Sequence, residues 1–166
     1  MTWTIEGSEL AEAILRAEKQ DRKLLLQELV VRPTSSQSAR VYAWRIAIIC
    51  VLLNQTKRQT GWIDAAALLD RFNTPAELSA CDETDIARVI HGGLQNVKAR
   101  SVVGLSTMAD LSYDPPSWPG VGDYALQAIK LFVDRTRPRD LSEISDGHLR
   151  DYARANWLGL DQKEPW

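Results

Sequence analysis

The chain has 166 residues, of which 45% are hydrophobic and 25% charged, a composition that fits one globular domain with a substantial core. Its formal net charge of −2 argues mildly against nucleic acid as a partner, although a local basic face would still bind it. The two cysteines, Cys50 and Cys81, lie far apart, so no zinc or iron–sulfur site can be built from cysteine. The first residues have no signal-peptide pattern and the longest apolar run is too short to span a bilayer. We therefore expect a cytoplasmic protein of a prokaryote or virus, with no membrane partner.

The first third of the chain predicts helices around one buried segment. Ser8 is a plausible N-cap for a helix whose apolar stripe runs through residues 10–15. Residues 24–31 predict a second piece of that helix or a new one, which ends before a polar loop at residues 34–38. Residues 41–53 are apolar on nearly every face, and their length favours a central buried helix over a strand.

The middle of the chain predicts further short helices. A polar cluster at residues 54–60 is either a solvent-facing loop or a working surface, and residues 62–72 have helical spacing. Thr74 and Glu77 form a capping box, and Asp82 caps the next helix. A long helix begins at Asn96 or Val97, and another begins at Ser145 or Asp146. No strand pattern is found, so we expect an all-α domain of about eight to ten short helices.

A glycine-rich turn, Pro119-Gly120-Val121-Gly122, leads directly into an apolar helix. Gly120 can adopt a positive φ, and Gly122 leaves room for a close approach to the backbone. The first turn of the helix offers free N–H groups at the positive end of its dipole, where a nucleic-acid phosphate binds well. A tight turn without any ligand is the alternative interpretation.

Three features follow one another along the chain: Asn54-Gln55 at the end of a buried helix, the glycine turn, and Asp146 at the start of a later helix. This order resembles the helix-hairpin-helix DNA glycosylases, the superfamily of endonuclease III and the adenine glycosylase that acts on mismatches. The resemblance covers roughly residues 40–157 and is closest to the small monofunctional thymine and uracil mismatch glycosylases that have no iron–sulfur cluster. It implies one glycosylase-like domain over residues 1–166, an all-α fold with two small helical lobes and a groove between them.

The resemblance also implies catalytic roles. Asp146 would stabilise the positive charge that builds on the deoxyribose or orient a water for attack. A plain N-cap is the alternative for Asp146, with Asp140 and Glu143 as substitutes for the catalytic role. Tyr124 occupies the position of the Schiff-base lysine in bifunctional relatives, so we expect hydrolysis without strand cleavage. Lys130 lies too far along the helix to replace it.

Further residues would contact DNA. By family position Gln55 fills the gap left by the flipped base and Asn54 lies at the pocket, although the thymine glycosylases carry an arginine where this chain has Gln55. The backbone of Gly120, Val121 and Gly122 would hold a phosphate, and a monovalent cation between these carbonyls and the phosphate is compatible with the resemblance. The candidate phosphate contacts, which are equally well explained as solvated charges, are Lys57, Arg58, Lys98 and Arg100. The aromatic side chains that would line a base pocket, or else belong to the core, are Tyr42, Trp44 and Trp118.

The resemblance implies a DNA N-glycosylase of base excision repair that removes a mismatched or modified pyrimidine, such as thymine, uracil or a 5-substituted uracil. Its partner would be double-stranded DNA, bound by a monomer without a cofactor. One alternative is a protein of the same fold that recognises or modifies unusual bases without excision. Another is an all-α protein-interaction domain with no nucleic-acid partner.

Overall fold

The computed structural model describes residues 9–20, 38–136 and 138–157 of the chain. This part consists of helices and turns and contains no strand, which confirms the all-α prediction. The expectations for Ser8, residues 24–31 and the loop from residue 34 lie outside the described residues. None of the described helices combines the length and apolar character that a membrane crossing requires.

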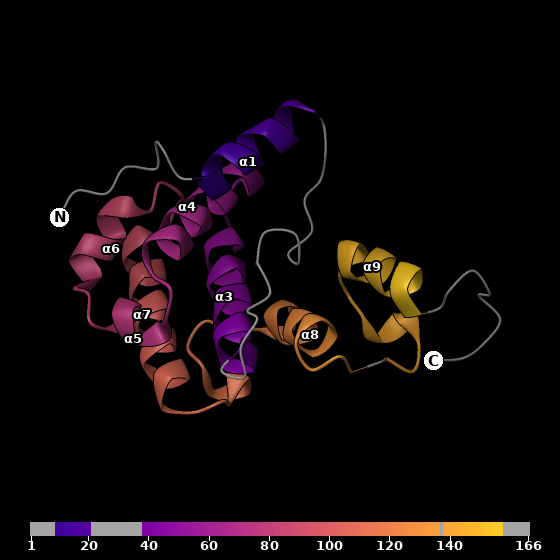
Figure 1. The fold of residues 1–166 in the computed structure, drawn as a ribbon. Helices are drawn as coiled ribbons and strands as arrows, with labels where there is room; N and C mark the ends of the chain where they lie inside the picture. The colour runs from indigo at the N-terminus through magenta and orange to yellow at the C-terminus, as the bar shows by residue number, and fades with distance from the viewer. Residues whose placement is uncertain (1–8, 21–37, 137, 158–166) are drawn as a thin grey trace.

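Short helices follow one another along the chain (Figure 1). The α-helices are α1 (Glu9–Lys19), α3 (Ser38–Leu53), α4 (Arg58–Arg71), α5 (Pro75–Ser79), α6 (Glu83–Val89), α7 (Gln95–Leu111), α8 (Asp123–Phe132) and α9 (Gly147–Trp157). Two single turns of 3-10 helix are η1 (Pro115–Ser117) and η2 (Leu141–Glu143).

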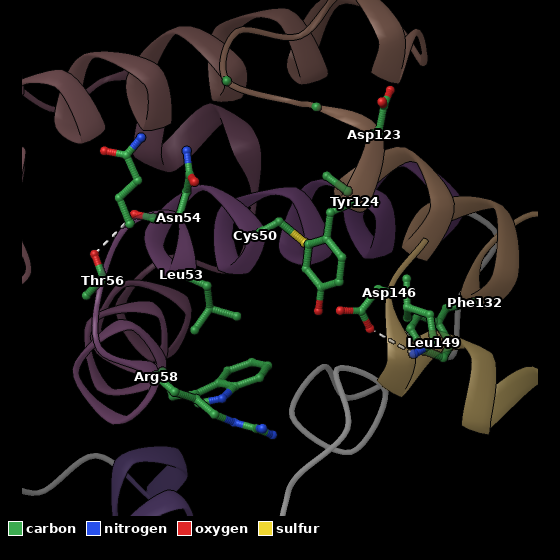
Figure 2. A pocket seen from close by; sticks show the side chains of 15 residues that line it. Cys50, Leu53, Asn54, Thr56, Arg58, Asp123, Tyr124, Phe132, Asp146 and Leu149 are labelled. Carbon is green, nitrogen blue, oxygen red and sulfur yellow. Dashed lines mark hydrogen bonds between the residues drawn. The ribbon is translucent and has the colours of Figure 1, made fainter. Parts of the chain in front are cut away.

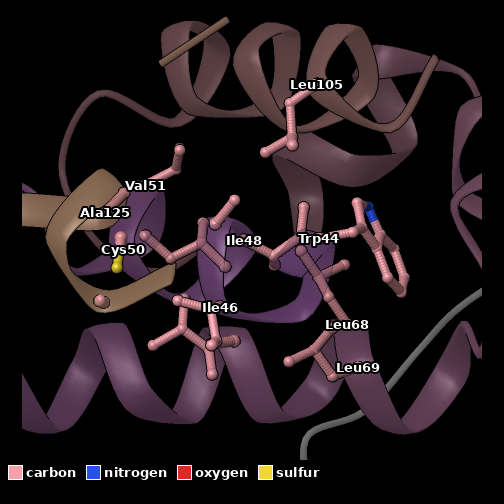
Figure 3. Close-up of a cluster of buried hydrophobic side chains, with 14 of the residues drawn as sticks. Trp44, Ile46, Ile48, Cys50, Val51, Leu68, Leu69, Leu105 and Ala125 are labelled. Carbon is pink, nitrogen blue, oxygen red and sulfur yellow. The ribbon is translucent and has the colours of Figure 1, made fainter. Parts of the chain in front are cut away.

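Helix α3 is the centre of the molecule, as its sequence predicted. It packs against α4, α7 and α8, and Figure 1 shows it between helices α4 to α7 on one side and helices α8 and α9 on the other. Its side chains enter the core on several faces, and Ile46 and Ile48 are fully buried (Figure 3). Burial of each such side chain contributes roughly 1.5–3 kcal/mol, so the apolar run fixes the position of this helix.

The predicted caps of α5 and α6 are confirmed. The Thr74 hydroxyl accepts a hydrogen bond from the Glu77 N–H at 3.3 Å, with a proline at the first helical position. The Glu77 carboxylate reaches back to the N–H of Asn73 at 2.7 Å, and the Asp82 carboxylate accepts from the Thr84 N–H at 2.7 Å. These caps satisfy backbone donors that a helix start leaves free.

Two predicted helix starts need correction. Helix α4 begins at Arg58 rather than at Trp62, because the polar segment that follows α3 makes only a short turn before the chain becomes helical again. Helix α7 begins at Gln95, immediately after Leu94, whose φ of 62° marks the end of the preceding turn. The sequence analysis placed both starts too late because the first residues of these helices are polar, and helix starts were predicted from the spacing of apolar residues.

The last helices lie on one side of α3 (Figure 1). Helix α9 packs against α8 and η2, and the rings of Phe132 and Tyr152 meet edge to face with their centroids 4.6 Å apart. Helix α8 packs in turn against α3. This chain of contacts brings the start of α9 close to the start of α8 and to the end of α3.

Candidate functional site

A pocket of about 500 Å³ opens where the end of α3, the start of α4, the glycine turn before α8 and the start of α9 meet (Figure 2). The segments that form it are far apart in the sequence. Its lining residues are Cys50, Leu53, Asn54, Gln55, Thr56, Arg58, Trp62, Gly120, Gly122, Asp123, Tyr124, Ala125, Phe132, Asp146 and Leu149. Seven of the predicted site residues therefore line one pocket: Asn54, Gln55, Arg58, Gly120, Gly122, Tyr124 and Asp146.

Asp146 is both a helix cap and part of the pocket wall. Its Oδ1 accepts a hydrogen bond from the Leu149 N–H at 2.9 Å, which caps α9. The side chain is half-buried, and Figure 2 shows its carboxylate beside the hydroxyl of Tyr124. The two interpretations of Asp146 are therefore compatible, because one carboxylate caps the helix and also faces the pocket.

Tyr124 and Cys50 line the pocket next to Asp146 (Figure 2). Burial raises the pKa of the Tyr124 phenol, and the neighbouring Cys50 and Asp146 raise it further against an opposing effect of Arg58. Burial likewise raises the pKa of the Cys50 thiol, with a second contribution from Asp146. Both groups therefore keep their protons at neutral pH, so the phenol is a hydrogen-bond donor and the thiol is not a thiolate nucleophile.

The end of α3 supplies the amide side chains of Asn54 and Gln55. Both residues are exposed and line the pocket. Gln55 has a φ of 53°, a left-handed conformation that is uncommon for residues other than glycine. Thr56 follows, and its hydroxyl donates to the Asn54 carbonyl at 3.2 Å.

The glycine turn approaches α3 and α7 closely. Gly120 has a φ of 76°, and a Cβ at this position would lie 3.1 Å from carbon atoms of Ser101 and Val51. Gly122 faces open space instead, because a Cβ there would meet nothing within 4 Å. Val121 packs against the core and donates its N–H to the Trp118 carbonyl at 3.2 Å, so its amide is already engaged.

An acidic residue follows the turn. Asp123 is exposed, begins α8 and lines the pocket, where its charge opposes the binding of an anion. Figure 2 shows its carboxylate directed away from Asp146. The start of α8 therefore offers N–H groups to a phosphate beside a side chain that repels one.

The four predicted phosphate contacts differ in their burial and in their distance from the pocket. Arg58 lines the pocket, and Lys57 is exposed next to it. Arg100 lies 3.8 Å from Glu83 in an exposed ion pair. Lys98 was predicted as a phosphate contact and is instead buried at 4% exposure, because its Nζ donates to the Leu52 carbonyl at 3.1 Å and to the Thr56 hydroxyl.

The three predicted base-pocket aromatics also need correction. Tyr42, Trp44 and Trp118 are at most 2% exposed and belong to the core, and none of them lines the pocket. Trp44 donates its indole N–H to the Ser106 hydroxyl at 2.8 Å, which fixes it between α3 and α7. An apolar helix such as α3 buries aromatic side chains on every face, so their chemistry alone did not reveal their direction.

The substitute carboxylates lie elsewhere. Asp140 caps η2 by accepting from the Ser142 N–H at 2.8 Å, and Glu143 accepts from the Arg139 N–H at 3.1 Å. Neither lines the pocket. Lys130 lies in a second pocket on the other side of α8. Asp146 is thus the candidate carboxylate that the structure places with the amide side chains and the glycine turn.

Several lining residues were missed by the sequence analysis. On α3, Leu53 directly precedes Asn54 and Cys50 lies one helical turn before it, while Trp62 lies one helical turn beyond Arg58 on α4. Helical spacing from the residues already singled out would have indicated Cys50 and Trp62. Among the described residues, no group of three or more His, Cys, Asp or Glu side chains is arranged to hold a metal ion.

No protein-family model matches the chain, and no curated protein matches it either.

Proposed function

We propose that this protein is a monofunctional DNA glycosylase that hydrolyses the N-glycosidic bond of a mismatched or modified pyrimidine flipped out of duplex DNA. The observation that carries the proposal is the pocket in which Asp146 and Tyr124 lie with Asn54, Gln55 and the glycine turn. These are the residues for which the resemblance to helix-hairpin-helix glycosylases implies a role, and the chain brings them together from distant segments.

The chemistry fits a carboxylate at this position. Breaking the bond between base and sugar leaves positive charge on the deoxyribose, and a nearby carboxylate stabilises that charge and orients an attacking water. The cap at Oδ1 fixes the direction of the Asp146 side chain without neutralising it. The protonated Tyr124 phenol is available as a hydrogen-bond donor beside this carboxylate.

The pocket also suits a nucleobase. Its volume of about 500 Å³ lies within the range of ordinary small-ligand sites. Apolar side chains from Leu53, Trp62 and Phe132 line it together with the Asn54 amide, a combination that buries a planar ring and reads its polar edge. Extrusion of the base costs a few kcal/mol and least for a mismatched base, which supports mismatched or damaged pyrimidines as substrates.

Strand cleavage by a Schiff base is not part of the proposal. No lysine is among the described residues that line the pocket. The resemblance to helix-hairpin-helix glycosylases implies that Tyr124 takes the position of the Schiff-base lysine. The expected product is therefore an intact strand with an abasic site. Borohydride should trap no covalent complex with DNA.

The proposal is tested with a panel of duplexes that carry thymine, uracil or a 5-substituted uracil opposite guanine or adenine. The strands are treated with alkali after incubation, which converts each abasic site into a break. We expect breaks only after alkali and only with particular base pairs. If no duplex yields a break while the protein binds DNA, the excision proposal is wrong.

The panel also separates the alternatives. Salt-sensitive DNA binding without abasic product would favour a module that recognises unusual bases without excising them. The cap made by Asp146 is the observation that favours this second candidate, because it gives that carboxylate a structural role. Absence of any DNA binding at low salt would contradict both candidates and favour a protein-interaction domain.

A further inference from the structure

A buried cation lies behind the turn that ends α3. Lys98, in the first turn of α7, is 4% exposed. Its Nζ donates to the Leu52 carbonyl at 3.1 Å and to the hydroxyl of Thr56, so one ammonium group ties the last turn of α3 to the segment that follows it. A cation is well placed there, because a helix C-terminus leaves carbonyls without partners and carries partial negative charge.

The hydrogen bonds continue from Lys98 into the pocket wall. Thr56 accepts from Lys98 and donates its own proton to the Asn54 carbonyl at 3.2 Å. Gln55 lies between these two residues with its left-handed φ of 53°. A glutamine in that conformation is strained, and such strain persists only where surrounding contacts hold it.

A second buried charge, Asp64, holds the loop that packs against Thr56. Asp64, on α4, is 1% exposed and accepts from the backbone N–H groups of His91 and Gly92 at 2.9 and 3.0 Å. Its other oxygen lies 3.0 Å from Nδ1 of the His91 ring. These bonds hold Gly92 against Thr56, where an added Cβ would lie only 2.6 Å from the Thr56 methyl group.

The two charges support each other without forming a direct ion pair. Burial lowers the pKa of Lys98, and the nearby Asp64 carboxylate opposes that shift. Yet every hydrogen bond that either side chain makes within the described residues ends on the α3 turn or on the loop at His91 and Gly92. The hydrogen bonds of both buried charges therefore fix the two segments that meet at Thr56.

We infer that Lys98 and Asp64 are positioning residues of the pocket: they clamp Thr56 between α7 and the loop at Gly92, and thereby hold Asn54 and Gln55 in the conformation that lines the site. The rigidity of this turn is a property of the protein alone. Its consequence for excision rests on the proposed function, in which Asn54 and Gln55 act on the extruded base and on the gap it leaves.

Hydrogen exchange tests the clamp without any substrate. The variants Lys98→Met, Asp64→Asn and Thr56→Val are compared with Arg88→Met and Thr107→Val, which change exposed residues of α6 and α7. We expect the backbone amides of Leu52, Leu53 and Asn54, which are hydrogen-bonded at the end of α3, to exchange about tenfold faster in the first three variants and at the wild-type rate in the controls. Thr56→Val keeps both buried charges, so it remains informative if a charge variant folds poorly. Unchanged exchange in a folded Thr56→Val protein would overturn the inference.

Excision kinetics then test whether Lys98 and Thr56 position the pocket residues, bind a DNA phosphate or only stabilise the fold. We expect Lys98→Met and Thr56→Val to lower single-turnover excision from duplex DNA roughly 10- to 100-fold, with a smaller loss on single-stranded DNA that needs no gap filled. Affinity for non-specific DNA and its salt dependence should match the wild type, because a buried ammonium releases no counterions. Equal losses on both substrates, or a reduced salt dependence, would contradict the positioning role. If the wild type excises no base, the proposed function fails while the exchange experiment still decides the clamp.

Discussion

At the scale of single residues, the double role of Asp146 allows its charge to be removed without its cap. Asparagine at this position keeps an oxygen that accepts from the Leu149 N–H, and it caps helices as well as aspartate does. We predict that Asp146→Asn lowers single-turnover excision by about 10²- to 10³-fold while thermal stability stays close to that of the wild type. The rates are measured by alkaline cleavage and the stability by thermal unfolding.

The matched control for that prediction is Asp140→Asn. Asp140 also caps a short helix through its carboxylate but does not line the pocket, so this change should leave excision unaltered. Retention of full activity by Asp146→Asn would assign the catalytic role to another group, and equal loss in both variants would indicate an indirect effect on the fold.

Tyr124 gives a second prediction for a single residue. Burial, Cys50 and Asp146 keep its phenol protonated, so its hydroxyl can donate to the substrate or to the reacting water. Tyr124→Phe removes only that hydroxyl, and we predict a loss of excision of about tenfold, the size of one hydrogen bond. Measured rates that match the wild type would reduce Tyr124 to a packing residue.

Sequence reasoning at this scale succeeded where chemistry and position in the chain agreed. Asn54, Gln55 and Asp146 stand at helix ends, where polar side chains are forced toward a surface, and the structure places them in one pocket. It failed for Lys98 and Trp44, which lie inside helices. The direction of an interior helical residue depends on which neighbours cover each face, and that information is absent from a single sequence.

At the scale of elements, the turn before α8 offers a matched pair of glycines. Gly122 faces open space with extended backbone, so alanine should be accommodated at no cost in stability. If the turn receives a phosphate, the added methyl group blocks the approach. We therefore predict that Gly122→Ala weakens DNA binding about tenfold, as measured by fluorescence anisotropy, without changing the thermal unfolding temperature.

Gly120 should behave in the opposite way. Alanine there must adopt a φ of 76° and places its Cβ against Ser101 and Val51. We predict that Gly120→Ala lowers the free energy of unfolding by about 1–2 kcal/mol, measured by urea denaturation. A stable Gly120→Ala protein, or a Gly122→Ala protein with normal affinity, would contradict this division of roles within the turn.

The elements themselves were largely predictable, because apolar periodicity and caps are local properties. The buried helix α3, the caps at Thr74 and Asp82, and the turn before α8 all followed from short stretches of sequence. The start of α4 was missed because its first turn is polar, and the clamp around Thr56 was missed because it joins three segments. Contacts between distant segments depend on the packed fold.

At the scale of the whole molecule, the thiol of Cys50 should make the free energy of unfolding depend on pH. It belongs to the hydrophobic core around α3 (Figure 3) and lines the same pocket as Asp146 (Figure 2). Burial first, and Asp146 second, raise the pKa of its thiol in the folded state. In the unfolded chain the thiol ionises above about pH 8.5, which stabilises the unfolded state alone.

The sign of the pH effect follows from that difference. The contribution of Cys50 to stability is complete below about pH 8.5 and falls by about 1.4 kcal/mol per pH unit above it. Lys98 has the opposite effect: its pKa is lowered in the folded protein, so the unfolded chain binds one more proton and stability rises with pH.

The wild type must therefore be compared with Cys50→Ala, in which the effect of Lys98 is unchanged. The free energy of unfolding of each protein is measured by urea denaturation between pH 7 and pH 10. The difference between the wild type and Cys50→Ala should stay constant up to about pH 8. Above that pH the wild type should lose stability relative to the variant by about 1.4 kcal/mol per pH unit. Parallel curves over the whole range would show that the thiol ionises as readily in the folded protein as in the unfolded chain.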